Sequence, residues 1–316
     1  MRARILMVTL LVAGCDSAPF PPTVNAVRGQ YLVQAVLACG DCHTTPQANG
    51  LPSFDPLDFL GGGREFDVQL GAVTQKFYAP NLTSDVATGL GGWSDAQVKR
   101  AIRSGIDNHD AALFPIMPYW AFGNMSDGDL QSIVLFLRTL PAKVNQTPED
   151  TFSVTSPAAL LDKGKLPQTT LAASDPNFAS AQHGRYLAGE LGACVHCHSP
   201  TGMLPEVPID VTRAFAGGQI FPLGPITTIS ANLTPDATGL AGWTADDIIN
   251  TVRTDTEKGH GRPLCPPMPG GPNRDGDMTP EDLTDIANYL TTIAPVPHGP
   301  FGCTDGGVPY GLDGGS

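Results

Sequence analysis

Basic side chains are scarce in this sequence. Its 316 residues include 18 Lys and Arg against 31 Asp and Glu, which gives a formal net charge of −13. We expect no nucleic-acid partner, because binding to phosphates requires a basic face. An acidic surface favours solubility and suits a basic protein partner.

Charged residues of both signs make up only 16% of the chain and aromatic residues 7%, whereas Gly and Pro number 36 and 30. This composition predicts short helices separated by long, ordered loops. Disorder is not expected, because the charge content is low and apolar residues recur along the chain.

Apolar runs long enough to span a bilayer are also lacking. The basic start MRAR is followed by ILMVTLLVAG, which has the length of a signal peptide core. The residues before Cys15 resemble a bacterial lipobox, so we expect a signal peptide at 1–14 and a lipid-anchored tether at 15–23. This predicts export to the periplasmic side of a bacterial membrane, and Asp16 favours the inner membrane. An ordinary signal peptide that contains a cysteine is the alternative.

Two halves of the sequence resemble each other. CGDCH recurs as CVHCH 155 residues later, and NLTSDVATGLGGWS recurs as NLTPDATGLAGWT. Such a long period indicates two copies of one domain of ordinary size. The predicted boundaries are 24–145 for the first domain, 146–180 for a connector, 181–298 for the second domain and 299–316 for a C-terminal tail.

The pattern of each copy predicts helices. We expect an opening helix at about 24–38, a second helix that begins at Ser94, and a closing helix that begins at Ser126. Ser94 and Gln97 form a capping-box pattern, and Thr244 and Asp247 repeat it. Because no alternating strand pattern competes, the predicted fold class is all-α. The apolar stripes of the closing helices are Leu130, Ile133, Val134 and Leu137, and Leu283, Ile286, Ala287 and Leu290.

Each copy contains a cysteine pair followed by a histidine. This CxxCH spacing is the attachment signature of c-type haem. Two thiols add to the two vinyl groups of the porphyrin, and the histidine ligates the iron from one side. We therefore predict two covalent haem c groups. Their residues are Cys39, Cys42 and His43 in the first copy, and Cys194, Cys197 and His198 in the second.

Two other uses of a CxxC pair fit this sequence less well. A structural zinc site requires four ligands, and each copy has only one such cluster. A thioredoxin-like redox pair expects a strand–helix context and needs no histidine.

Three cysteines lie outside the CxxCH motifs. Cys15 is assigned to lipidation, which leaves Cys265 and Cys303. An even remainder in an exported protein predicts a disulfide between them. Phe114 stands at the position of Cys265 in the first copy, so this disulfide would belong to the second domain alone.

The second axial ligand decides between an electron carrier and an enzyme. Met117 and Met268 hold equivalent places, each followed by proline. Methionine opposite histidine is an electron-transfer arrangement and raises the reduction potential. The alternatives are methionines that only fill the core, and ligation by His109 or His260, which lie eight residues earlier in each copy.

Matched tryptophans and arginines are candidates for contacts with the haem propionates. A buried indole N–H needs an acceptor, and an arginine forms charge-assisted bonds with a carboxylate. Packing or surface exposure is the alternative role. The candidates are Trp93, Arg103, Trp243 and Arg253.

Asn81 and Asn232 each begin an Asn-Leu-Thr triplet, which fits the glycosylation pattern. Because the two triplets occupy matched positions in the repeat, we interpret them as turns instead.

These motifs resemble those of bacterial di-haem cytochromes c with two class I cytochrome c domains. CxxCH, NLTPD, TGLGGWS and MPY are similar to motifs in the cytochrome c subunits of membrane-associated alcohol, aldehyde and sugar dehydrogenases. The resemblance covers about residues 24–145 and 181–298. It implies tandem all-α domains, each folded around one covalent haem c. The second copy departs from the pattern with MPG in place of MPY.

We therefore expect a lipid-anchored periplasmic carrier of single electrons. The resemblance implies a dehydrogenase or quinol-oxidising complex as donor, a cytochrome or oxidase as acceptor, and no small-molecule substrate. The alternative is an enzyme of the di-haem peroxidase type or a haem-based sensor, each of which needs one open or displaceable iron site.

Overall fold

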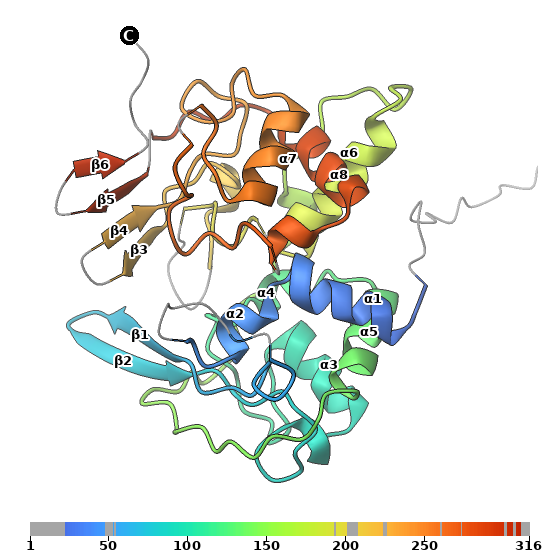
Figure 1. Ribbon diagram of the computed structural model, residues 1–316, viewed down its shortest axis with the longest axis vertical. Coiled ribbons are helices and arrows are strands. Elements are labelled where there is room, and N and C mark those ends of the chain that lie inside the picture. Colours follow the sequence, from blue (N-terminus) through green and yellow to red (C-terminus); the bar gives the residue numbers. More distant parts are fainter. Residues whose placement is uncertain are drawn as a thin grey trace, which may run out of the picture.

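Two halves of the chain, one above the other in Figure 1, make up the molecule. This computed structural model describes residues 23–47, 53, 55–192, 194–200, 208–223, 226–259, 261–272, 274–299, 302–305 and 308–310. The predicted signal peptide, Cys15 and most of the predicted tether lie outside the described residues.

The first half consists of short helices and one β-hairpin. The helices are α1 (Ala26–Tyr31), α2 (Cys39–His43), α3 (Asp95–Ser104), α4 (Tyr119–Phe122) and α5 (Asp127–Leu137), with a π-helical turn η1 (Leu32–Val36) and a 3-10 turn η2 (Leu90–Gly92). Strands β1 (Glu65–Leu70) and β2 (Val73–Tyr78) pair antiparallel.

The second half repeats most of this order. Its elements are α6 (Phe178–Arg185), a π-helical turn η4 (Tyr186–Glu190), a 3-10 turn η5 (Val211–Arg213), α7 (Ala245–Thr254), a 3-10 turn η6 (Asp275–Asp277) and α8 (Pro280–Leu290). An antiparallel sheet of order β3-β4-β5-β6 contains β3 (Ile220–Leu223), β4 (Ile226–Ile229), β5 (Cys303–Asp305) and β6 (Val308–Tyr310).

The β-hairpins correct the expectation of an all-α fold, because strands accompany the helices in both halves of the described chain. Side chains of β1 alternate between exposed and half-buried, and Gly71 adopts a φ of 63° in the tight turn that follows. The sequence signal was present and was missed, because the polar residues Glu65, Asp67 and Gln69 alternate strictly with the apolar residues Phe66, Val68 and Leu70. Both sheets lie on the same side of the molecule (Figure 1).

The predicted helix starts are confirmed at the capping residues. The Ser94 side chain accepts from the Gln97 backbone N–H while Gln97 accepts from Ser94, and Thr244 with Asp247 forms the same capping box. The opening helix differs from the expectation, because after α1 it continues as the π-helical turn η1. The eight residues of the predicted apolar stripes on α5 and α8 are all buried.

A glycine in each opening helix lets it press against the closing helix of its own half. A Cβ at Gly29 would lie 1.9 Å from the Ser132 carbonyl oxygen, and one at Gly184 would lie 1.9 Å from the Asp285 carbonyl oxygen. Neither position accommodates a side chain, so the α1–α5 and α6–α8 contacts depend on glycine.

The connector is ordered and packs on both halves. Its Ala158 N–H donates to the Tyr119 hydroxyl at 2.7 Å, and its Pro167 carbonyl oxygen accepts from the Tyr289 hydroxyl at 2.8 Å. Leu166 is buried, and a short 3-10 turn η3 (Lys163–Lys165) precedes it. Buried residues of both halves join in one hydrophobic cluster. None of the helices in the described part of the chain has the length and apolar character to cross a membrane.

Candidate functional site

The first CxxCH motif forms the short helix α2, directly after the opening helix. Ala38 adopts a left-handed conformation with a φ of 45° and so turns the chain between the two. His43 is buried, and its Nδ1 lies 2.9 Å from the Pro80 carbonyl oxygen. When Nδ1 donates this bond, the other ring nitrogen, Nε2, keeps its lone pair and is available to a metal.

The second motif repeats this arrangement. His198 Nδ1 lies 2.8 Å from the Ala231 carbonyl oxygen, and the Gly217 N–H donates to the His198 carbonyl oxygen at 2.8 Å. The corresponding bond in the first half joins Gly62 to the His43 carbonyl oxygen at 2.7 Å. Both histidines are therefore fixed through the ring and through the backbone.

The Asn-Leu-Thr triplets hold the carbonyl groups that orient these histidines. Asn81 directly follows Pro80, is 2% exposed, and donates through Nδ2 to the Lys143 carbonyl oxygen at 2.7 Å. Its Oδ1 accepts from the Thr83 N–H at 2.9 Å.

Asn232 follows Ala231 in the same way. It donates to the Val296 carbonyl oxygen at 2.8 Å and accepts from the Thr234 N–H at 2.9 Å. Both asparagines are buried and engaged, which excludes glycosylation and confirms the interpretation as turns.

The protonation of the two motifs suits attachment of an iron porphyrin. Burial lowers the pKa of His43 and of His198, which favours the neutral imidazole that ligates metals. Burial also raises the pKa of the Cys39 thiol to about 12 and that of Cys42 to about 11. All four cysteines of the two motifs have free thiols. Two neutral thiols beside one oriented imidazole are the donor set that covalent haem c requires.

Met117 and Met268 lie in corresponding loops. The Met117 N–H donates to the Phe114 carbonyl oxygen at 3.3 Å, and the Met268 N–H donates to the Cys265 carbonyl oxygen at 3.1 Å. Both side chains are partly buried. Met117 packs against the hydrophobic cluster, as do Cys39 and Cys194. Axial ligation by these methionines stays a prediction.

The rival axial histidines are placed differently. His109 is exposed, and its backbone N–H donates to the Asp107 carboxylate at 2.8 Å. His260 lies outside the described residues.

The arginine candidate of the first half has protein partners of its own. Arg103 forms an ion pair with Asp127 at 2.7 Å and donates to the Met125 carbonyl oxygen at 2.7 Å. These bonds direct its guanidinium to the start of α5. Arg103 and Arg253 each keep a buried Nε that has no hydrogen-bond partner among the described residues.

The tryptophan candidates are both partly buried. Trp93 and Trp243 pack against the hydrophobic cluster, and the Lys258 ammonium lies over the Trp243 ring at 5.2 Å. Contact of Trp93, Trp243, Arg103 and Arg253 with a propionate stays a prediction.

Sequence reasoning missed that both CxxCH motifs take part in the contact between the halves. Asp41, inside the first motif, forms an ion pair with Arg274 of the second half. His196, inside the second motif, lies against Trp120 of the first half, with 5.5 Å between ring centroids. Trp120 lies in the segment after Met117, and Arg274 lies in the segment after Met268. The two motifs therefore approach each other across the interface.

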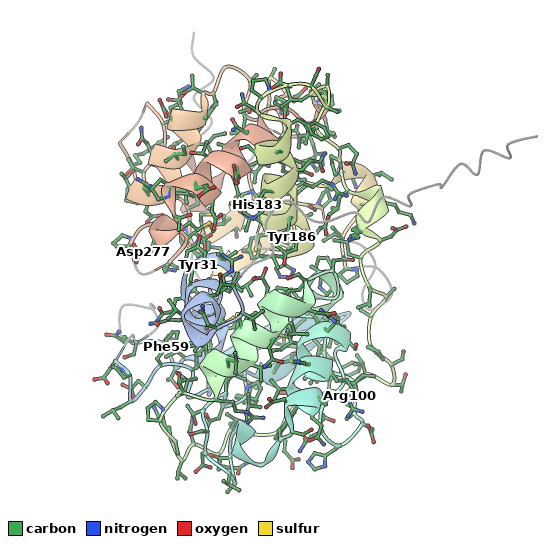
Figure 2. All side chains as sticks on the ribbon, turned by 90° about the vertical axis from the view of Figure 1, so that its right-hand side faces the viewer. Tyr31, Phe59, Arg100, His183, Tyr186 and Asp277 are labelled. Atoms are coloured by element: carbon green, nitrogen blue, oxygen red, sulfur yellow. The ribbon has the colours of Figure 1, made fainter. Side chains whose placement is uncertain are left out.

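Tyrosines and carboxylates beside these motifs also join the halves. Tyr31 and Tyr186 lie where the halves meet (Figure 2). Tyr31 donates to the Asp282 carboxylate, and Tyr186 donates to that of Asp129. The sequence feature that could have identified these four residues is the repeat, because Tyr31 matches Tyr186 and Asp129 matches Asp282.

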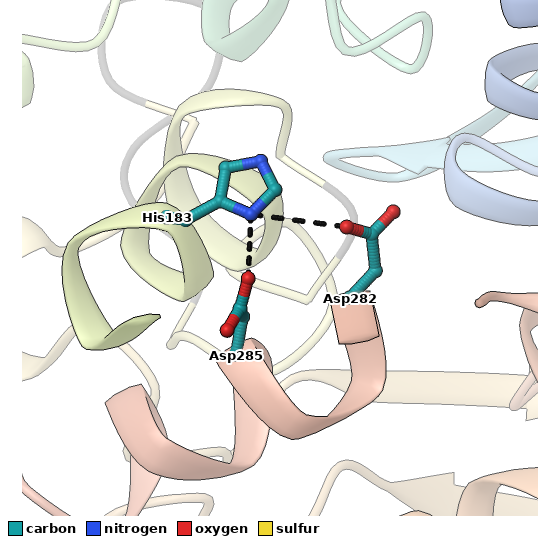
Figure 3. Close-up of side chains that lie close together, drawn as sticks. All are labelled: His183, Asp282 and Asp285. Atoms are coloured by element: carbon teal, nitrogen blue, oxygen red, sulfur yellow. Dashed lines mark hydrogen bonds and ion pairs between the residues drawn. The ribbon is translucent and has the colours of Figure 1, made fainter. Parts of the chain in front are cut away.

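His183 and two carboxylates form a cluster at the start of α8 (Figure 3). His183 Nδ1 lies 2.7 Å from Asp285 and 3.8 Å from Asp282. Donor atoms of the three residues lie within 4.8 Å of one another. In the first half Arg28 holds the matching place and pairs with Asp129 at 2.9 Å. His183 therefore takes the place of this arginine, and the neighbouring Asp285 carboxylate raises its pKa, which favours the charged imidazolium.

No family model matches the chain. It is 27% identical to the gluconate 2-dehydrogenase cytochrome c subunit of Pantoea cypripedii, over 84% of this chain and 59% of that protein. It is 28% identical to the cytochrome c subunit of a quinone alcohol dehydrogenase from Gluconobacter oxydans, over 86% of this chain and 55% of that protein. A diheme cytochrome c-type protein of Cereibacter sphaeroides is 28% identical over 74% of this chain and 82% of its own length.

The class that these relatives share is cytochrome c, which implies haem c and electron transfer. In particular, homologues at 26–28% identity over most of the chain are cytochrome c subunits of quinone alcohol, gluconate and fructose dehydrogenases and a diheme cytochrome c. The chain spans less than two thirds of the length of the alcohol, gluconate and fructose dehydrogenase subunits.

Proposed function

We propose that the protein is a di-haem electron-transfer protein of the periplasm, tethered to a membrane. It would pass single electrons from a dehydrogenase or quinol-oxidising complex to a downstream cytochrome or oxidase. The observation that carries this proposal is the repeated orientation of His43 by Pro80 and of His198 by Ala231 beside two CxxC thiol pairs.

Each half has its own set of residues for one haem c. Cys39 and Cys42 would form the thioethers of the first haem, with His43 and Met117 as axial ligands. When bound, haem c supplies an iron that exchanges one electron and no proton. The bond from Nδ1 to a carbonyl holds the imidazole ring in one orientation and favours the Nε2 lone pair on the iron side. The matching set of the second half is Cys194, Cys197, His198 and Met268.

Redox protein partners are supported by the relatives that are subunits of dehydrogenase complexes. The net charge of −13 favours partners that present a basic face. Association should weaken as salt is added, because exposed charges are screened over about 8–10 Å at physiological ionic strength. No small-molecule substrate is part of this proposal.

Membrane attachment through a lipid on Cys15 is part of the proposal, and its support is the MRAR start, the short apolar run and the small residues before the cysteine. Replacement of Cys15 with Ser should release the protein from the membrane fraction into the soluble periplasm without a change in haem content. Retention of the variant in the membrane fraction would contradict the anchor.

The Cys265–Cys303 disulfide is likewise proposed. The side chain of Cys303 lies outside the described part of the structure, but the strand register pairs its backbone with Thr228. Thr228 in turn donates to the Pro266 carbonyl oxygen at 2.5 Å. Pro266 directly follows Cys265, so the backbones of the two cysteines lie in one neighbourhood. Mass spectrometry of the unreduced protein should find the two peptides joined.

The first test of the function is the optical spectrum of the purified ferric protein together with a haem count. Two haems, both low-spin and with the weak far-red band of methionine–iron ligation, would support two closed electron-transfer centres. One high-spin haem, or one that binds cyanide or peroxide readily, would contradict the proposal. Such a result would favour the peroxidase or sensor alternative instead.

A further inference from the structure

Two phenol groups cross the interface between the halves in a reciprocal manner. Tyr31, at the end of α1, donates to Asp282 Oδ2 and accepts from the Thr279 backbone N–H at 3.2 Å. Tyr186, at the start of η4, donates to Asp129 Oδ2 at 2.6 Å and accepts from the Ser126 N–H at 3.1 Å. Each phenol therefore bridges the N-cap amide of the other half's closing helix and the carboxylate three residues later.

Both phenols donate to carboxylates that are shielded from solvent. Asp129 is 1% exposed and Asp282 is 6% exposed. Burial, followed by the partner carboxylate, raises the pKa of Tyr31 and of Tyr186 well above the ordinary value, so both stay protonated donors. A bond from a neutral donor to a buried carboxylate is among the stronger hydrogen bonds in proteins.

Each carboxylate is also held within its own half. Asp129 pairs with Arg28 at 2.9 Å, and Asp282 lies 3.8 Å from His183 Nδ1. Each acceptor therefore has a charged neighbour in its own half as well as the phenol from the other half. A fixed acceptor turns a hydrogen bond into a constraint on the relative position of the two halves.

The constraint acts directly beside the two CxxCH motifs. Tyr31 is followed by η1, which leads into Cys39, and Tyr186 begins η4, which leads into Cys194. Across the same interface Asp41 pairs with Arg274. Across it, too, His196 of the second motif lies against Trp120 of the first half, with 5.5 Å between ring centroids.

We propose that Tyr31 and Tyr186 are positioning residues that hold the two CxxCH motifs at a fixed separation across the interface between the halves. The inference rests on the proposed function, because a fixed separation matters for passage of an electron between two haem sites. This positioning role differs from haem attachment by the CxxCH motifs and from axial ligation of the iron.

The variants that test the proposal are Tyr31→Phe, Tyr186→Phe and the double variant, each in the holoprotein. Tyr289→Phe is the matched control. It removes a buried phenol that donates to the Pro167 carbonyl oxygen at 2.8 Å, away from the interface bonds. The first half has Phe136 at the matching position, so phenylalanine suits that site of the fold.

Two readouts separate positioning from general stability. Amide hydrogen exchange follows the first turns of α5 and α8, where the Ser126 and Thr279 amides donate to the phenols. The rate of electron equilibration between the two haems is measured after flash reduction of one of them. The two midpoint potentials are measured alongside to show that the driving force is unchanged.

We expect Tyr31→Phe to increase exchange at the start of α8 and Tyr186→Phe to increase it at the start of α5. The double variant should slow equilibration several-fold, because the rate of electron transfer falls steeply as the distance between two redox centres grows. Tyr289→Phe should change neither readout. Unchanged exchange at both helix starts, or an unchanged equilibration rate in the double variant, would overturn the positioning role.

A failure of the proposed function gives a different result. Absence of any equilibration in the unsubstituted holoprotein would overturn the proposed function and this inference with it. Equilibration in the unsubstituted protein that the double variant matches would overturn the inference alone.

Discussion

The Nδ1 atom of His43 lies 2.9 Å from the carbonyl oxygen of Pro80. That carbonyl belongs to the residue before Asn81, whose buried side chain holds the turn. The orientation of the imidazole therefore depends on a side chain that never contacts it. The same dependence links His198 to Asn232 through Ala231.

Replacement of Asn81 with Ala should destabilise the first half. The change leaves the Lys143 carbonyl oxygen and the Thr83 N–H without the bonds that Asn81 makes, and each buried unsatisfied group costs about 1–3 kcal/mol. Denaturant unfolding of the oxidised holoprotein measures the loss. Asn177→Ala is the control, because Asn177 is exposed and its side chain makes no capping bond. Equal stability of the two variants would contradict the role of the turn.

Replacement of Met117 with Ala should open the sixth position of the first haem, and Met268→Ala should do the same in the second. We expect loss of half of the far-red methionine–iron band in each variant, appearance of one high-spin haem, and binding of cyanide or carbon monoxide at that haem. The control is Met125→Leu, because Met125 is buried in the hydrophobic cluster. Unchanged spectra in both alanine variants would refute the axial assignment.

The pH dependence of stability should differ between His183 and an arginine at the same place. The hydrogen bond to Asp285, above all, raises the pKa of His183 above 6.5. Its contribution is therefore fully present below pH 6.5 and is lost as the pH rises through the folded-state value. It should amount to about 1.5–3 kcal/mol, as for other hydrogen bonds to charged groups.

His183→Arg should remove this pH-dependent component, because arginine stays charged and Arg28 already fills the matching place. Chemical unfolding at several values between pH 6 and pH 9 measures it. His183→Gln should instead be as unstable at pH 6 as the unsubstituted protein is at pH 9. A variant with the same pH profile as the unsubstituted protein would disprove the role of His183.

Replacement of Asp275 with Asn should stabilise the protein at neutral pH. Asp275 is buried, and burial, followed by the charge of Asp41, raises its pKa well above 3.8. A raised carboxyl pKa contributes stability below pH 3.8 that is lost as the pH rises through the folded-state value. Above that value the ionised group is a cost, which Asn avoids.

We expect Asp275→Asn to raise the free energy of unfolding at pH 8 and to leave it unchanged at pH 4, because only the ionised form of the buried carboxyl group costs stability. Thermal unfolding at both pH values checks this. Glu281→Gln, at an exposed position nearby, should change stability little at either pH. A loss of stability at pH 8 in Asp275→Asn would show that the ionised carboxylate is stabilised in the fold.

Local chemistry was sufficient to predict the helix starts and the buried faces. Ser94 with Gln97 and Thr244 with Asp247 are recognisable because the capping residues lie only three positions apart. The CxxCH motifs and the Asn-Leu-Thr turns were recognisable for the same reason, and the repeat doubled each signal. The π-helical turns that follow α1 and α6 had no local signal of this kind.

The first β-hairpin could have been predicted from the sequence, whereas the interface could not. In β1 apolar residues alternate strictly with polar ones, which is the pattern of a strand with one side toward the core. Tyr31 and Asp282 are 251 positions apart, and no periodicity relates residues at that distance. The contact depends on how one domain docks on the other, which only the folded surfaces of both determine.

The residues between the two cysteines of each CxxCH motif differ between the halves and make different contacts. Asp41 meets Arg274 through charge, whereas His196 meets Trp120 through ring packing. Two copies of the first half would bring Asp41 to a surface that offers Trp120, and two copies of the second would bring His196 to one that offers Arg274. Each of these contacts therefore needs one residue from each half, and neither half carries both partners of either contact.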